Sequence, residues 1–321
     1  MKKFIFCLTF LIVSSFISKT FCQDNEGPQK FIFNASVTTA YSHEKYEYSL
    51  IDVKGKENSR LEWEADYLFK LGLRGAFKYQ SFEVFASALF PLPFDCGKMY
   101  DSDWRTEGIK TNLSIHDFAV KFGCDAMLGI KYNFELGTDI KAITISPILA
   151  ISNSYISFAG KKGIGWGADI AHTGLPRDYS WDSEYAVKVK KFGIDFTSNS
   201  TSALLGVEVS KNFGGLFASA GILTSPYTFI LSVDHHLNRE EGNYYQLVQN
   251  AFFKVWDFYA ATGYSVNSKN TLLLFADFSL CSSTPGYFYV GYYKIENTLV
   301  EETSRFSFSK LSFNLSWQLN I

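Results

Sequence analysis

The sequence predicts an all-β protein, a closed antiparallel transmembrane β-barrel with long extracellular loops. Three observations support this. Apolar and polar residues alternate with a period of two in many segments, as the two faces of a strand require. No run of 18 apolar residues follows the N-terminal segment, which excludes helical membrane spans. Aromatic residues make up 17% of the chain, with 31 Phe and 19 Tyr, and this enrichment suits the interfacial girdles of such a barrel.

The first 22 residues predict a secretory signal peptide. Met1-Lys2-Lys3 is a basic start, and an apolar stretch from Phe4 to Ile17 follows. That stretch is too short for a transmembrane helix, which needs about 20 apolar residues. Cys22 leaves a lipidated alternative open, although Phe21 and Lys19 fit a lipidation site poorly. We expect cleavage near Cys22 without lipidation, so that residues 23–321 form one barrel domain.

The C-terminal segment is the clearest strand. One face is wholly apolar and the other wholly polar, and the pattern continues to the last residue, as it commonly does in outer-membrane barrels. The apolar face carries Leu311, Phe313, Leu315, Trp317, Leu319 and Ile321. Three further runs alternate similarly, at 67–74, 82–90 and 271–280. A soluble all-β secreted protein is the alternative interpretation of these patterns.

Polar, turn-rich segments separate the alternating runs. Long loops at one end of the barrel and short turns at the other are typical of outer-membrane barrels. The segments assigned to long loops are 53–58, 95–112, 160–183, 236–245 and 296–304. The short turns are expected at Lys78–Ser81, Ser210–Gly215 and Asn267–Asn270. Because backbone groups in hydrocarbon must all be paired, the strands between them have to close into a ring.

Charge and cysteine content exclude several classes of function. The net charge is −2, and no stripe of lysine or arginine exists, so nucleic acid is not an expected partner. After the signal peptide only Cys96, Cys124 and Cys281 remain, with no Cys-x-x-Cys pair, so no zinc ribbon or disulfide framework is indicated. At most one disulfide could form.

Two short polar clusters could carry chemistry. Asp101 and Asp103 are two residues apart, so on an extended backbone both carboxylates face the same side. Asp234 and His236 also share a face, and such a pair could orient and activate a water molecule. Each spacing alone is common in solvated loops. The glycine-rich segment 163–167 has no expected helix after it, and we interpret it as loop architecture rather than a phosphate-binding loop.

These clusters, taken together, resemble the omptin family of outer-membrane endopeptidases, which are ten-stranded barrels. Ser59-Arg-Leu-Glu-Trp63 is similar to that family's Ser-x-Leu-Asp-Trp segment. Gly97-Lys-Met-Tyr-Asp-Ser-Asp-Trp104 resembles its Asp-x-Asp-Trp segment, and Asp234-His-His236 resembles its catalytic Asp-x-His. The three motifs occur in the family's order and approximate spacing. Weaker likeness extends from about Asn34 to the C-terminus.

The resemblance implies a ten-stranded barrel in the cell outer membrane that hydrolyses peptide bonds as an aspartic-type endopeptidase. Asp234 and His236 would form the dyad that polarises the attacking water. Asp101 and Asp103 would position that water from across the barrel and would raise one another's pKa values. The implied partners are polypeptide substrates at the cell surface and outer-membrane lipid, with a lipopolysaccharide requirement that many omptins have. The resemblance implies no metal and no cofactor. We expect a monomer.

The chain also departs from the family pattern. Members that cut beside basic residues carry an acid two residues before the catalytic aspartate, where this chain has Ser232. Glu44 or Glu47 could supply a second acid of the substrate-binding pocket, and the sequence leaves both open. His235 is either an additional titrating group or an outward side chain. The alternative function is a non-enzymatic outer-membrane barrel, an adhesin or an inactive omptin relative, and a small porin is a further option.

Overall fold

The computed structural model describes residues 31–105, 108–137, 142–175, 178–237, 243–291 and 298–320. The expected signal peptide and the lipidation question at Cys22 lie outside this part of the chain. Residues Ile32–Ile321 form one compact unit. Among the described residues, no helix is long and apolar enough to cross a membrane.

The described chain is almost entirely strand, in one continuous sheet. The elements are β1 (Phe31–Ile51), β2 (Glu57–Tyr79), β3 (Phe82–Pro91), β4 (Asp95–Asp103), β5 (Asn112–Tyr132), β6 (Phe134–Leu136), β7 (Ile143–Gly160), β8 (Gly163–Gly167), α2 (Ile170–Thr173), β9 (Val187–Lys191), β10 (Ile194–Phe213), β11 (Leu216–His236), β12 (Asn243–Ala251), β13 (Val255–Asn267), β14 (Asn270–Gly291) and β15 (Thr298–Asn320).

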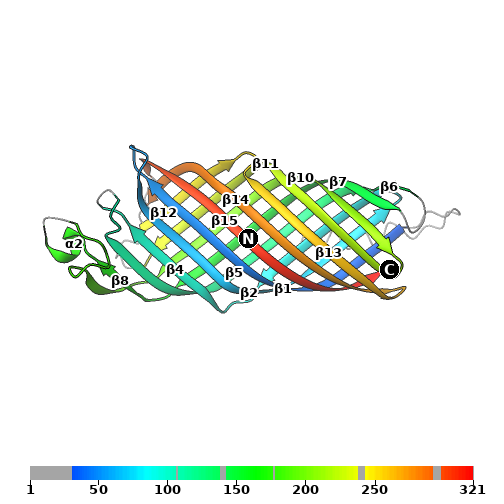
Figure 1. Cartoon of the computed structure of the whole chain (residues 1–321), viewed down its shortest axis with the longest axis horizontal. Helices are drawn as coiled ribbons and strands as arrows, with labels where there is room; N and C mark the ends of the chain where they lie inside the picture. Colours follow the sequence, from blue (N-terminus) through cyan, green and yellow to red (C-terminus); the bar gives the residue numbers. More distant parts are fainter. Residues whose placement is uncertain are drawn as a thin grey trace. The chain divides into compact units, whose positions relative to one another are not determined.

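Ten antiparallel strands close into a ring, so the predicted fold class is confirmed. β3 and β4 both pair with β2 and with β5, and therefore make one interrupted strand. β12 and β13 form a second interrupted strand between β11 and β14. The pairing of β1 with β15 joins the ends of the chain, and the pairing of β5 with β7 completes the circle. Figure 1 shows the strands tilted along the barrel.

The two ends of the barrel differ as expected. Short turns follow Tyr79, Phe213 and Asn267 at one end, where the connection between β5 and β7 is longer and carries β6. The connection that carries β8, α2 and β9 lies at the opposite end. Figure 1 places β8 and α2 at the long-loop end and β6 at the other. The predicted extent of several loops is wrong. Residues 95–103 form β4, and 163–167 form β8, because both find ladder partners on β5. The four-residue helix α2 also follows the glycine-rich segment, where none was expected.

The strands are longer than a membrane requires. A transmembrane strand needs about 9–11 residues, whereas β1 has 21 and β2 and β15 have 23. An exposed apolar belt covers one half of their outer face, for example at Leu71 and Leu73, which are 47% and 56% exposed. Beyond that belt the outward side chains are charged: Lys45 contacts Glu62 and Glu64 there. The long-loop half of the barrel therefore extends out of the membrane.

An aromatic plug fills the lumen in this outer half. Trp63 is fully buried and stacks on Phe158 and Phe196 at 5.8 and 5.2 Å between ring centroids. Phe118 packs against Phe158 at 4.6 Å. The plug consists of seven buried aromatic side chains, Tyr46, Trp63, Phe118, Phe158, Phe196, Phe306 and Phe308. Because these side chains are buried against one another, they separate the two ends of the lumen.

Candidate active site

Three inward-facing residues of β1 mark successive layers of the lumen. Inward side chains are two residues apart, which is about 7 Å along a strand. Glu44 lies in a cluster of ion pairs, Tyr46 belongs to the aromatic plug, and Tyr48 contacts Asp234. The candidate active site is therefore the layer on the long-loop side of the plug, beyond the apolar belt.

Asp234 and His236 form a hydrogen-bonded pair on β11. Nε2 of His236 lies 3.0 Å from Oδ2 of Asp234. Asp234 is fully buried, and the ring of Tyr245 packs edge-on against His236, with 5.0 Å between centroids. Because Asp234 accepts at that nitrogen, the imidazole presents Nδ1 away from the carboxylate. The pair thus has the local geometry of a general base with an orienting acid.

Tyr48 is a member of this site that the sequence did not indicate. Its hydroxyl donates a hydrogen bond to Oδ2 of Asp234, the same oxygen that meets His236. Burial and the charge of Asp234 raise the pKa of Tyr48 well above its ordinary value, so the phenol remains a donor. The only sequence signal is that Tyr48 continues the inward face of β1. Nothing local connects it with a residue 186 positions later.

Asp101 and Asp103 lie on β4, and the charges of Asp103 and of the dyad act on Asp101. Burial, followed by the charge of Asp103, raises the pKa of Asp101 to about 7. The charge of His236 lowers that pKa, and the charge of Asp234 raises it. Such an influence requires that Asp101 and the dyad approach each other across the barrel. The closed ring thus brings together all four acid and base residues that the sequence singled out.

Asp103 is linked to the loop beyond the barrel through Asn112. The side-chain amide of Asn112 donates to Oδ2 of Asp169 at 2.7 Å and reaches Oδ2 of Asp103 at 3.4 Å. Asp169 caps α2 and contacts Nδ1 of His172 at 2.7 Å. These bonds restrict the position of Asp103. Asn112 lies opposite Asp103 on the neighbouring strand, a relation that only the register reveals.

The glycines of β8 leave room at the same end of the lumen. A Cβ on Gly165 would lie 2.8 Å from Cε of Lys191 and 3.2 Å from Cβ of Ser114. A Cβ on Gly163 would lie 2.6 Å from Nδ1 of His116. The bare inner face of β8 therefore lets Lys191 reach the strand beside Asp101, and its charge lowers the pKa of Asp101.

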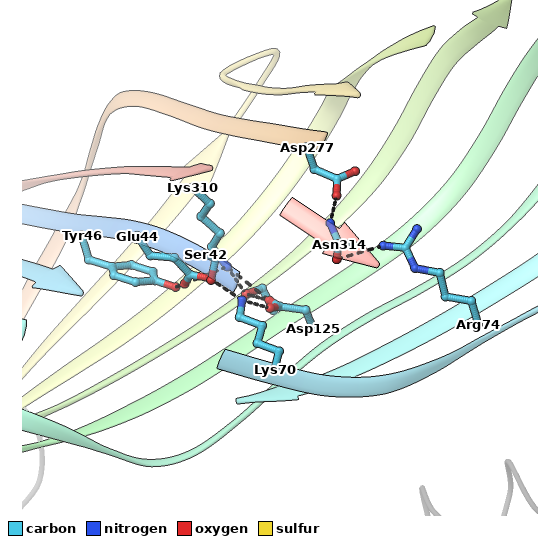
Figure 2. A network of polar contacts seen from close by, with 10 residues as sticks. Ser42, Glu44, Tyr46, Lys70, Arg74, Asp125, Asp277, Lys310 and Asn314 are labelled. Atoms are coloured by element: carbon cyan, nitrogen blue, oxygen red, sulfur yellow. Dashed lines mark hydrogen bonds and ion pairs between the residues drawn. The ribbon is translucent and has the colours of Figure 1, made fainter. Parts of the chain in front are cut away.

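Glu44 lies in the lumen, but its carboxylate is already occupied. Lys70 donates to its Oε1, and Ser42 and the hydroxyl of Tyr46 donate at 3.0 and 2.6 Å. Figure 2 shows Glu44 meeting Lys70 and Lys310. Both lysines also bind Asp125, at 2.6 and 3.2 Å. The ion-pair cluster, defined as Glu44, Lys70, Asp125 and Lys310, is thus internally neutralised.

The other pocket residues do not supply a free acid either. Glu47 faces the outer wall, where it lies 3.7 Å from Lys45 and 4.0 Å from Arg60. Ser232 faces inward, fully buried, and donates to Ser198 at 3.1 Å. His235 faces outward opposite Asp195 in the register of β10 and β11.

On the other side of the ion-pair cluster lies a lumenal cavity of about 380 Å³. Charged side chains line it, among them Arg74, Asp257 and Asp277. Figure 2 shows Asn314 bridging Arg74 and Asp277, at 3.4 and 2.5 Å. The aromatic plug and the ion-pair cluster lie between this cavity and the candidate active site. Among the described residues, no group of three or more His, Cys, Asp or Glu could hold a metal ion. Cys96, Cys124 and Cys281 form no disulfide with one another.

Comparison with known proteins supports the class of the fold. No protein-family model matches the sequence, and no curated protein matches it. The structure is similar to the outer membrane protease OmpT from Escherichia coli, with a TM-score of 0.79 and 13% sequence identity. That alignment covers 93% of this chain and 99% of that one. The outer membrane protein OprG from Pseudomonas aeruginosa aligns over 93% of this chain and 99% of its own, with a TM-score of 0.35 and 10% identity.

The protein is an outer-membrane β-barrel. At 13% identity the similarity to the protease concerns the fold. The chemistry therefore has to be argued from the residues at the outer end of the lumen.

Proposed function

We propose that the protein is an outer-membrane endopeptidase, of the aspartic type that the omptins represent. The hydrogen bond between His236 and Asp234, within reach of the charges of Asp101 and Asp103, is the observation that carries the proposal. One acid–base pair is common in proteins. Two acid-containing pairs from different sides of a lumen, with a carboxyl pKa of about 7, mark a candidate functional site.

The proposed mechanism needs no covalent intermediate. A water molecule between His236 and Asp101 gives a proton to Nδ1 of His236 as its oxygen attacks the scissile carbonyl carbon. Asp234 stabilises the imidazolium that results. His236 then returns that proton to the leaving nitrogen when the C–N bond breaks. Ionised Asp101, restrained beside Asp103, orients the water, and a pKa near 7 leaves a large fraction of it ionised at neutral pH.

The substrates in this proposal are polypeptides outside the cell, because the site lies beyond the membrane belt at the long-loop end. The proposed enzyme is a monomeric barrel. Whether cleavage needs lipopolysaccharide is measured in the experiment below. Glu44 is neutralised and Glu47 faces outward, so neither is proposed as a receptor for an arginine or lysine of the substrate. Ser232 remains a proposed lining residue.

The deciding experiment is digestion of a mixed peptide library by the refolded barrel, with and without lipopolysaccharide. The variants Asp101→Ala, Asp234→Ala and His236→Ala are run beside it. Their barrels are checked by heat-modifiable electrophoretic mobility, which reports closure independently of chemistry. We expect cuts that disappear in all three variants. Cleavage by His236→Ala at the wild-type rate would contradict the mechanism.

A non-enzymatic surface barrel, such as an adhesin or an inactive omptin relative, is the second candidate. It is favoured by the replacement of an acid by Ser232 and by the neutralised Glu44. A folded wild-type barrel that cuts nothing in either lipid condition would favour this candidate. The aromatic plug argues against a porin, because it leaves no open path along the lumen.

A further inference from the structure

The hairpin of β8 and β9 lies beside the candidate active site. β8 pairs with β5 from Asn112 to Ile115. This range includes Ser114, which pairs with Asp101 on the other edge of β5. β9 pairs with β8 along its full length, and within the described part of the chain no strand pairs with its other edge. An edge strand presents a row of backbone donors and acceptors that an extended peptide can pair with.

This edge carries three lysines, Lys188, Lys190 and Lys191. Within the described ranges, no carboxylate lies in ion-pair distance of any of them. Lys188 and Lys190 are exposed, and the ammonium of Lys188 lies 5.7 Å from the ring of Trp166. Lys191 points the other way, across Gly165 toward Ser114, which pairs with Asp101. β9 thus presents positive charge on both of its faces, and its Lys191 end reaches the candidate active site.

Among the described residues, neither Glu44 nor Ser232 offers a free carboxylate to a cationic side chain beside the dyad. The carboxylate of Glu44 is bound by two lysines, and Ser232 is buried against Ser198. A peptide that pairs with β9 therefore meets three lysines and no carboxylate on that strand. Charge complementarity favours an acidic partner at this edge.

We propose that the free edge of β9 binds an extended, acidic segment of the polypeptide substrate by strand addition. The substrate's main chain pairs with residues 187–191, and its aspartates and glutamates meet Lys188, Lys190 and Lys191. The inference rests on the proposed function, because it makes β9 the docking strand of the protease. It also gives the substrate class: extended polypeptides with acidic residues near the cleavage site. Edge lysines alone can serve to prevent aggregation, so the experiment has to measure binding.

Binding is measured on the refolded full-length His236→Ala barrel, so that no probe is cut. The probes are dye-labelled ten-residue peptides with Glu at alternate positions, the same peptide with Gln, and the same with Lys. A fourth copy of the Glu peptide carries N-methyl groups on alternate backbone nitrogens. We expect the Glu peptide to bind about tenfold more tightly than the Gln peptide at low salt, and the N-methylated copy to lose most of that affinity.

Lys188→Glu/Lys190→Glu tests the location, since it reverses two charges and leaves Lys191 beside Asp101 untouched. Lys54→Glu/Lys56→Glu is the matched control, because both lysines are exposed in the turn between β1 and β2. The first variant should weaken binding of the Glu peptide by about tenfold or more, and the second should not. Equal affinity for the Glu and Gln peptides, or equal loss in both variants, would overturn the inference.

Cleavage of the Glu and Gln peptides by the wild-type barrel separates this inference from the proposed function. Binding of the Glu peptide at β9 without any cleavage contradicts the proposed protease and leaves the docking strand in place. Cleavage of both peptides at one rate, with no effect of Lys188→Glu/Lys190→Glu, supports the protease and contradicts the docking strand.

Discussion

Tyr48 donates a hydrogen bond to the oxygen of Asp234 that also meets His236. The two residues come from β1 and β11, on separate parts of the ring, and the bond crosses the lumen above the aromatic plug. A buried carboxylate needs such donors, because a charge removed from water without hydrogen bonds is strongly destabilised. Tyr48 therefore determines how Asp234 is presented to the imidazole.

Replacing Tyr48 by Phe should reduce peptide cleavage without opening the barrel. A hydrogen bond to a charged group contributes about 1.5–3 kcal/mol, so kcat/KM should fall roughly 10- to 100-fold. Tyr46→Phe is the matched control, because it removes a buried hydroxyl that donates to Glu44 instead. The measurement is kcat/KM for one peptide in both variants. Equal losses would show that the hydroxyl acts only through general stability.

The pH dependence of cleavage should follow the ionisation of Asp101, whose pKa is about 7. If the ionised carboxylate orients the water, kcat/KM rises as the pH increases through that value. Lys191 lowers the pKa of Asp101, so Lys191→Met should raise it and move the rising limb to higher pH. The pH profile is recorded from pH 5 to 9 for wild type and variant. A limb that stays in place, or moves to lower pH, would contradict the assignment.

The same pKa has a consequence for stability. Asp101 ionises less readily in the folded barrel than in the unfolded chain. Its contribution to the free energy of unfolding is therefore most favourable below its ordinary pKa and is lost as the pH rises through about 7. Asp101→Asn should therefore raise the thermal unfolding midpoint at pH 9 more than at pH 4, while it abolishes cleavage. An Asn variant that is less stable at pH 9 would contradict the burial of this charge.

The aromatic plug should make the barrel non-conducting. Trp63 stacks on Phe158 and Phe196 with no exposed surface, and the ion-pair cluster lies beneath these rings. Wild-type protein in a planar bilayer should show no steady single-channel current. Trp63→Ala should cost about 3–5 kcal/mol of unfolding free energy, because it leaves a large cavity. Steady conductance of the intact wild-type barrel would contradict the plug and restore the porin interpretation.

The ion-pair cluster predicts a non-additive pair of substitutions. Lys70→Met leaves Glu44 buried with Lys310, 3.8 Å away, as its remaining cation, and breaking a buried ion pair costs up to about 3–5 kcal/mol. The double variant Glu44→Gln/Lys70→Met removes both charges and should recover a large part of that loss. Urea titration of the refolded barrel measures both. A double variant no more stable than Lys70→Met would show that the two residues act separately.

Some features of the protein follow from local sequence alone. The alternation from Leu311 to Leu319 determines a strand with one lipid-facing side, because successive side chains point to opposite faces. Because every backbone group in hydrocarbon must be paired, strands that cross a membrane have to close into a ring. The pairs Asp101/Asp103 and Asp234/His236 could likewise be predicted to share a face, since each is separated by two residues.

Other features depended on register and closure, which local patterns do not specify. Glu44 and Glu47 were equivalent candidates in the sequence. In the tertiary structure Glu44 belongs to the ion-pair cluster, and Glu47 faces the outer wall. Residues 95–103 and 163–167 carry turn-rich compositions, yet they became strands because β5 offered them ladder partners. Tyr48 and Asn112 contact the site residues only across strands. Alternation in the sequence showed which residues of a strand share a face. The closed ring decided which polar face is inward and which inward side chains meet, because those contacts join strands that lie far apart in the chain.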